Sequence, residues 1–260
     1  VSSVVTIGAL NFNVSRLTGP AIAGLLIANF GVTVTMVIVC LLYIPYLAIF
    51  SQLKPRDRNV ETVTLPFWQS MREGFVFVST NRLILIAMIT TGLFSLVIRA
   101  SLEVLPIIAD GVFERGAAGL GIITATAGVG AIIASLRQGV ASPAVKNHIP
   151  KRALIATLLG SALTLALGMN ADWTTAIILI GGIGFTSTIV GINFQAAVQM
   201  QLNDDIRGRV MSLWMTVAVG GTALGALTVG VLIDHFGFAM ALSGIGIGSI
   251  IVFAALFSKF

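Results

Sequence analysis

Three charged residues lie within long apolar stretches of the sequence, where charge is otherwise rare: Arg16, Arg99 and Glu103. Charges at membrane depth are costly, so such residues usually pair with one another or carry ions, protons or substrates. Arg99 and Glu103 are four positions apart and would share one face of a helix. Glu103 is therefore a candidate carrier of a coupling proton, with a structural ion pair to Arg99 as the alternative. Arg16 either faces a central cavity or clamps two halves of the protein together.

Uncharged polar and aromatic residues also gather in the apolar stretches. Polar groups in an apolar medium need partners, and they often line a wet cavity; hydrogen bonding between helices explains them equally well. Aromatic side chains can line a pocket for an amphiphilic substrate, although packing in the core or against lipid is their commoner role. The candidate cavity residues are Asn11, Asn193, Gln195, Gln199 and Trp214, with Phe94, Phe185 and Phe194 as further aromatic members.

The composition indicates what must position these residues. The chain has 260 residues, of which 57% are hydrophobic and 10% charged, against roughly 25% charged residues in ordinary soluble domains. Spanning a bilayer takes about 20 mostly apolar residues, and lipid requires the backbone to satisfy its own hydrogen bonds. The sequence thus predicts an all-α integral membrane protein, with spans near 4–28, 32–53, 83–109, 117–140, 152–170, 173–202, 208–234 and 237–258.

The basic residues alternate between successive loops, which predicts an orientation. On one side of the predicted membrane, the loops carry a single basic residue, Arg115. The loops on the other side, together with the end of the chain, carry twelve. The positive-inside rule places the basic side in the cytoplasm. We therefore expect a cytoplasmic C-terminus. The basic positions are Lys54, Arg56, Arg58, Arg72, Arg82, Arg137, Lys146, Lys151, Arg152, Arg207, Arg209 and Lys259.

The longest connection, residues 54–82, contains an amphipathic pattern. Apolar residues recur at helical spacing from Phe67 to Val78, with polar residues between them. Pro66 suits the first turn of a helix. We expect a helix over 66–80 that lies in the cytoplasmic membrane interface, or else one that packs on the bundle as a lid.

A glycine pattern occurs twice, 206 positions apart. Gly19, Gly24 and Gly31 recur as Gly225, Gly230 and Gly237, as in the internal repeats of secondary transporters. Because the first copy begins close to residue 1, we expect an N-terminal portion to be missing. Gly19 and Gly24 allow a neighbouring helix to approach closely, and Pro20 bends its own helix. This contact either seals two halves of the protein or is plain packing of small residues.

These motifs resemble the major facilitator superfamily over essentially the whole chain, as its helices five to twelve. The stretch around Gly19, Pro20 and Gly24 is similar to the antiporter motif of helix five, although Ala23 replaces one glycine of the family pattern. The segment 204–212 resembles the loop before helix eleven in the branch that includes enterobactin and macrolide exporters. Glu73-Gly74-Phe75 resembles the central loop of the same branch. The residues of segment 204–212 that could form a cytoplasmic latch are Asp204, Asp205, Arg207 and Arg209; simple anchoring by positive charge is the alternative.

The resemblance implies three regions. Residues 1–53 hold the last two helices of an N-terminal half, residues 54–82 the central cytoplasmic loop, and residues 83–260 a six-helix C-terminal half. The missing helices of the N-terminal half are an expected partner, since alternating access needs both halves. We expect the 260 residues alone not to transport.

The expected function is secondary active export, in the inner membrane of a bacterium, of small amphiphilic molecules such as a drug, macrolide or siderophore. The resemblance implies alternating access and coupling to protons. No nucleic acid, metal or cofactor is expected: neither His148 nor His235 lies in a metal-binding pattern, and no phosphate-binding glycine loop or nucleophile elbow occurs. Enzymatic activity is therefore not expected. The alternative is a non-transporting membrane module, such as a permease-like subunit or an inactive product.

Overall fold

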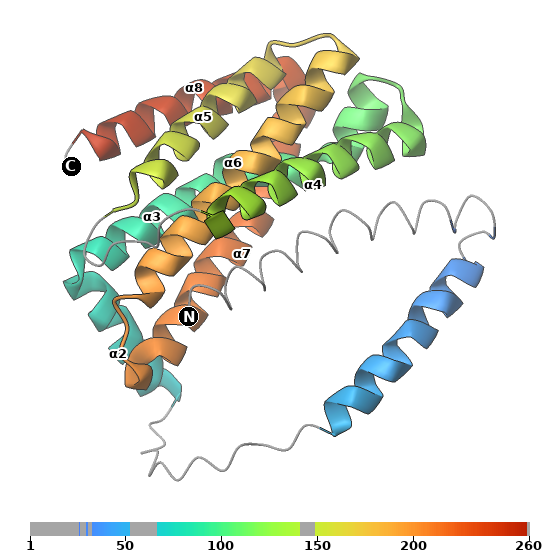
Figure 1. Cartoon of the computed structure of the whole chain (residues 1–260). Coiled ribbons are helices and arrows are strands. Elements are labelled where there is room, and N and C mark those ends of the chain that lie inside the picture. Colours follow the sequence, from blue (N-terminus) through green and yellow to red (C-terminus); the bar gives the residue numbers. More distant parts are fainter. Residues whose placement is uncertain (1–25, 27–29, 31–32, 53–66, 141–148, 259–260) are drawn as a thin grey trace.

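The computed structural model describes residue 26, residue 30 and residues 33–52, 67–140 and 149–258 (Figure 1). All regular structure in this part of the chain is helical. Seven of the described helices are long and apolar enough to cross a membrane, beginning with Thr33–Ser51. The others follow in chain order as α3 (Arg82–Val97, extended by a short turn), α4 (Gly116–Val140), α5 (Lys151–Gly168), α6 (Trp173–Gln199), α7 (Asp204–Phe236) and α8 (Phe238–Phe257).

These helices correspond to seven of the eight expected spans, and the first expected span, 4–28, lies outside the described residues. The helix α2 (Phe67–Thr80) also matches the amphipathic segment expected at 66–80. The start of one helix differs from the expectation, and it changes how the expected latch segment is interpreted. The helix α7 begins at Asp204 rather than near 208, so segment 204–212 belongs to a helix and not to a loop.

The span expected as one helix over 83–109 is interrupted. The α-helix ends at Val97, and a 3₁₀ turn, η1 (Arg99–Leu102), and a π-helical turn, η2 (Ile107–Val112), follow. Pro106 has no amide hydrogen to donate to the carbonyl of Leu102, so one hydrogen bond of a regular helix is lost within this stretch. The hydrogen-bond spacing changes around Pro106: the Ile107 amide donates to the Val104 carbonyl, three residues back, at 3.0 Å, and the Phe113 amide donates to the Ile108 carbonyl, five residues back, at 3.2 Å.

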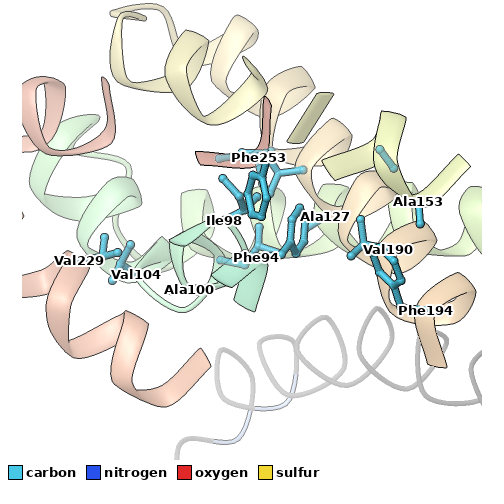
Figure 2. Close-up of a cluster of buried hydrophobic side chains, with 14 of the residues drawn as sticks. Phe94, Ile98, Ala100, Val104, Ala127, Ala153, Val190, Phe194, Val229 and Phe253 are labelled. Atoms are coloured by element: carbon cyan, nitrogen blue, oxygen red, sulfur yellow. The ribbon is translucent and has the colours of Figure 1, made fainter. Parts of the chain in front are cut away.

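A hydrophobic cluster fills the space between the helices. This cluster includes Phe94 of α3, Ile98 directly after α3, and Phe253 of α8 (Figure 2). Each of the three side chains is 2% exposed or less. Many apolar side chains on other faces point outward, such as Leu227 and Met240, each 69% exposed. Apolar residues on the outside of a bundle suit lipid rather than water.

Close helix contacts are made at glycines, where a side chain would not fit. A Cβ atom on Gly130 of α4 would overlap the backbone carbonyl of Gly181 on α6, and one on Gly184 would overlap that of Ala127. A Cβ on Gly246 of α8 would similarly overlap Leu165 of α5. In lipid, where the surroundings are as apolar as the helices, such backbone approach is a main source of helix association.

The end of the bundle at which α4 and α6 begin is fixed by polar and aromatic contacts. The side chain of Asp172 caps α6 by accepting from the amide of Thr175 at 2.7 Å and from its hydroxyl at 2.9 Å. These hydrogen bonds, first of all the one from the Thr175 amide, lower the pKa of Asp172. The guanidinium of Arg115 lies 5.6 Å from the ring centre of Trp173, an aromatic residue type that is enriched at membrane surfaces.

Candidate functional site

A charged contact joins the helix α2 to the first turns of α7. Arg209 donates from Nη1 to Oε2 of Glu73, and the two side chains are 28% and 40% exposed. Directly beside this pair, Gly74 is buried against Arg209 and Leu213, with space for no more than a small residue. α2 lies at the end of the bundle at which α7 begins (Figure 1). A charged contact and a close backbone contact therefore fix α2 on α7.

The other expected latch residues take different positions. Asp205 is exposed in the first turn of α7, Asp204 begins that helix, and Arg207 donates from Nη2 to the backbone carbonyl of Leu202 at 3.3 Å. Sequence reasoning placed the acidic partners beside the arginines and missed Glu73. The sequence did contain an indication that Glu73 and Arg209 could be partners, because they belong to the two motifs that resemble one exporter branch. The role of these residues as a latch stays a prediction.

Two of the three charges expected within membrane spans, Arg99 and Glu103, lie where α3 loses its regular form; the candidate span ends at Leu102, directly before Glu103. Arg99 begins the 3₁₀ turn η1 and is half-buried, and Glu103 directly follows that turn and is exposed in the described chain. The turn η1 packs against both α6 and α7. Two charged residues beside an interruption of a candidate membrane helix are candidates for a functional role, which stays a prediction. Arg16, the third such charge, lies outside the described residues.

The three candidate cavity residues of α6, Asn193, Gln195 and Gln199, are half-buried rather than enclosed. Asn193 donates from its side-chain amide to the carbonyl of Ile189 at 2.8 Å, which is bonding within its own helix. Gln195 and Gln199 remain half-buried one turn apart. Trp214 is 3% exposed and belongs to the hydrophobic cluster with Phe194, so packing accounts for it in this conformation. Asn11 lies outside the described residues.

Three buried hydroxyl groups were missed by sequence reasoning. Most buried hydroxyls of the bundle bond to a carbonyl one turn earlier in their own helix, as Thr157 of α5 does with Ala153 at 2.8 Å. Thr90 and Thr91 of α3 and Ser187 of α6 have buried hydroxyl oxygens with no hydrogen-bond partner among the described residues. Because α3 and α6 pack against each other and an unpaired buried polar atom is costly, these oxygens are further candidates to bind water or a polar substrate group. Hydropathy does not reveal such groups, since serine and threonine are common in membrane helices.

The second copy of the glycine pattern lies in α7 and shows what its positions do. Gly225 packs so closely on α3 that a Cβ would overlap the carbonyl of Leu96. Gly230 has no atom of another described residue within 4 Å of the position of a Cβ. Gly237, with φ of 78°, separates α7 from α8. The first copy, with Gly19, Pro20 and Gly24, lies outside the described residues, so its role as a seal stays a prediction.

Comparison with known proteins decides the family. Residues 1–260 match the profile of a major facilitator family described as transmembrane secretion effectors. The chain belongs to this family. It is 26% identical over 250 residues to the enterobactin exporter EntS of Shigella flexneri, a match that covers 94% of this chain and 57% of that protein. It is also 26% identical over 252 residues to EntS of Escherichia coli O1:K1, with the same coverage. No solved structure matches the chain.

Membership confirms several expectations. The chain is an all-α integral membrane protein of the major facilitator superfamily and of its exporter branch, as the resemblance implied. The family is one of transporters and not of enzymes. The chain spans 57% of the length of the EntS proteins that it matches. Which helices of those proteins it corresponds to, and the boundaries at 53 and 82, stay predictions.

Proposed function

We propose that this secretion effector is a secondary active exporter of small amphiphilic molecules that works by alternating access. The observation that carries the proposal is the match of the whole chain to a secretion family, together with EntS relatives that align over 94% of it. The relatives export enterobactin, so a siderophore-like substrate is the first class to test. We place the protein in the bacterial inner membrane, with the basic loops and the C-terminus in the cytoplasm, because of the alternating basic residues.

Two structural features support movement of the kind that alternating access needs. The interruption of α3 between Val97 and Ile107 provides a place at which a membrane helix can change its bend. The ion pair of Glu73 with Arg209 is half-exposed. Such pairs contribute about 0.2–1 kcal/mol, so it can break and re-form during a transport cycle. For coupling, we propose Glu103 as the proton carrier, with Arg99 as its charge partner.

Transport in inverted membrane vesicles tests the proposal. The protein expressed from its complete gene is compared with empty vesicles, using a labelled siderophore and a macrolide, with and without a proton gradient. Accumulation that needs both the protein and the gradient supports proton-coupled export. Accumulation that persists after the gradient collapses contradicts proton coupling. Absence of accumulation with every probe favours the non-transporting membrane module.

A further inference from the structure

The helix α2 has three distinct sides, and only one of them packs on the described part of the bundle. The packed side carries Glu73, Gly74, Phe77 and Val78: Glu73 bonds to Arg209, Gly74 lies on Leu213, and Val78 is 5% exposed. Phe77 is half-buried against the hydrophobic cluster. This side accounts for the docking of α2 but leaves most of its apolar surface uncovered.

A second side of α2 is apolar and exposed. Trp68, Met71 and Phe75 follow the spacing i, i+3 and i+7, so they form one stripe along the helix. They are 78%, 39% and 67% exposed. Large apolar side chains in one continuous stripe are costly in water and mark a surface that meets lipid or a partner.

The position of α2 indicates lipid as the occupant. A single residue, Asn81, joins α2 to α3, and its side chain caps that membrane helix by accepting from the Ile84 amide at 3.2 Å. α2 also packs on the first turns of α7, another membrane helix. The stripe therefore lies at the level where two spans enter the bilayer, which is the depth that interfacial helices occupy.

The charge on the third side selects the kind of lipid. Arg72 is exposed and follows Trp68 by one helical turn, so it borders the apolar stripe. Glu73 is the only acidic residue of α2, and it is engaged by Arg209. Gln69, Ser79 and Thr80, the remaining polar residues of the exposed surface, are uncharged. A cation next to an inserted apolar stripe fits the negative surface of an anionic leaflet.

We propose that α2 is a membrane-surface helix that inserts the stripe Trp68, Met71 and Phe75 into the anionic cytoplasmic leaflet while its opposite side holds α7. The helix thereby links the lipid surface to the Glu73–Arg209 pair. This inference does not depend on the identity of the substrate, and it uses the proposed orientation of the bundle.

Site-directed spin labelling tests the insertion. In the protein from its complete gene, with Cys40, the single cysteine of this chain, changed to serine, a nitroxide is attached at Met71→Cys or Phe75→Cys. The matched control is Gln69→Cys, on the outer side of the same helix. In nanodiscs, collisions with oxygen, which concentrates in lipid, are compared with collisions with a water-soluble nickel chelate. We expect oxygen to dominate at the two stripe positions and nickel at the control.

Two other outcomes overturn the proposal. Equal access of nickel to all three labels makes the stripe a solvated surface. Exclusion of both reagents from the stripe means that protein covers it, either another segment of this protein or a second copy.

The proposed preference for anionic lipid is tested by comparing two lipid compositions. Nanodiscs of phosphatidylcholine alone are compared with nanodiscs that also contain phosphatidylglycerol, for the parent protein and for Arg72→Gln. The anionic lipid should raise the ratio of oxygen to nickel collisions at Phe75→Cys, and Arg72→Gln should remove that rise. The same ratio in both lipid mixtures overturns the preference for anionic lipid.

Discussion

Glu73 and Arg209, which are 136 positions apart in the sequence, form an ion pair that joins the central helix α2 to the beginning of α7. The pair lies next to Gly74, whose missing side chain lets α2 lie directly on Arg209 and Leu213. Two neighbouring residues of α2 thus supply the charge and the space that this contact needs. The contact connects the loop between the two expected halves to a helix of the second half.

Removal of either charge should loosen α2 without unfolding the bundle. We expect Glu73→Gln and Arg209→Gln each to lower stability modestly, with a coupling energy between them of about 0.2–1 kcal/mol, because the pair is half-exposed. Thermal unfolding in detergent of the two single variants and the double variant measures this energy, which should fall as salt increases. Additive effects of the two changes would contradict a direct pair.

A side chain at the α4–α6 contact should be far more harmful than one elsewhere on α4. Gly130→Leu would force the Gly181 carbonyl away, and we expect a loss of about 1–3 kcal/mol or more, since backbone and not a flexible side chain is in the way. Gly121→Leu is the matched control, because no atom of the described residues lies within 4 Å of a Cβ there. Unfolding in detergent compares them, and equal stability of the two variants would show that the contact is not tight.

The role of Glu103 can be separated from that of Arg99 by a double change. If Glu103 carries the proton, Glu103→Gln should abolish gradient-driven export and retain substrate binding. If the two residues are a structural pair, that variant should be destabilised, since breaking a buried pair costs about 3–5 kcal/mol in soluble proteins, and less where Glu103 is exposed. Arg99→Gln combined with Glu103→Gln should then recover folding and transport. Export at the parental rate by Glu103→Gln alone would exclude both roles.

The first turn of α6 should loosen in acid. Hydrogen bonds in the folded protein lower the pKa of Asp172 below that of an ordinary aspartate, so the stabilising contribution of this cap is present above the ordinary pKa and is lost as the pH falls through the lower, folded pKa. Hydrogen exchange of residues 173–177 should show this, measured against Asp172→Asn at each pH so that intrinsic exchange cancels. Asparagine caps a helix without titrating. A constant difference between the two proteins from pH 7 to pH 2 would contradict the prediction.

The sequence by itself determined the class of the protein, the positions of its membrane helices and the existence of α2. Apolar runs of about 20 residues have few alternatives to membrane spans, so the expected spans and the described helices agree within a few residues for Thr33–Ser51, α5 and α8. The motifs around Glu73 and Arg209 were also visible in the sequence. They indicated the exporter branch to which the family match assigns the chain.

Only the tertiary structure decided which residues meet. In lipid, the outside of a helix is as apolar as its packed side, so hydropathy does not mark the side that faces a neighbour. The sequence therefore could not tell Gly130, which packs on a backbone carbonyl, from Gly121, which meets no neighbouring helix in the described part of the chain. The partner of Arg209 was hidden for another reason. Nearby Asp204 and Asp205 were the simpler choice in the sequence, and only the docking of α2 on α7 brings Glu73 to the arginine.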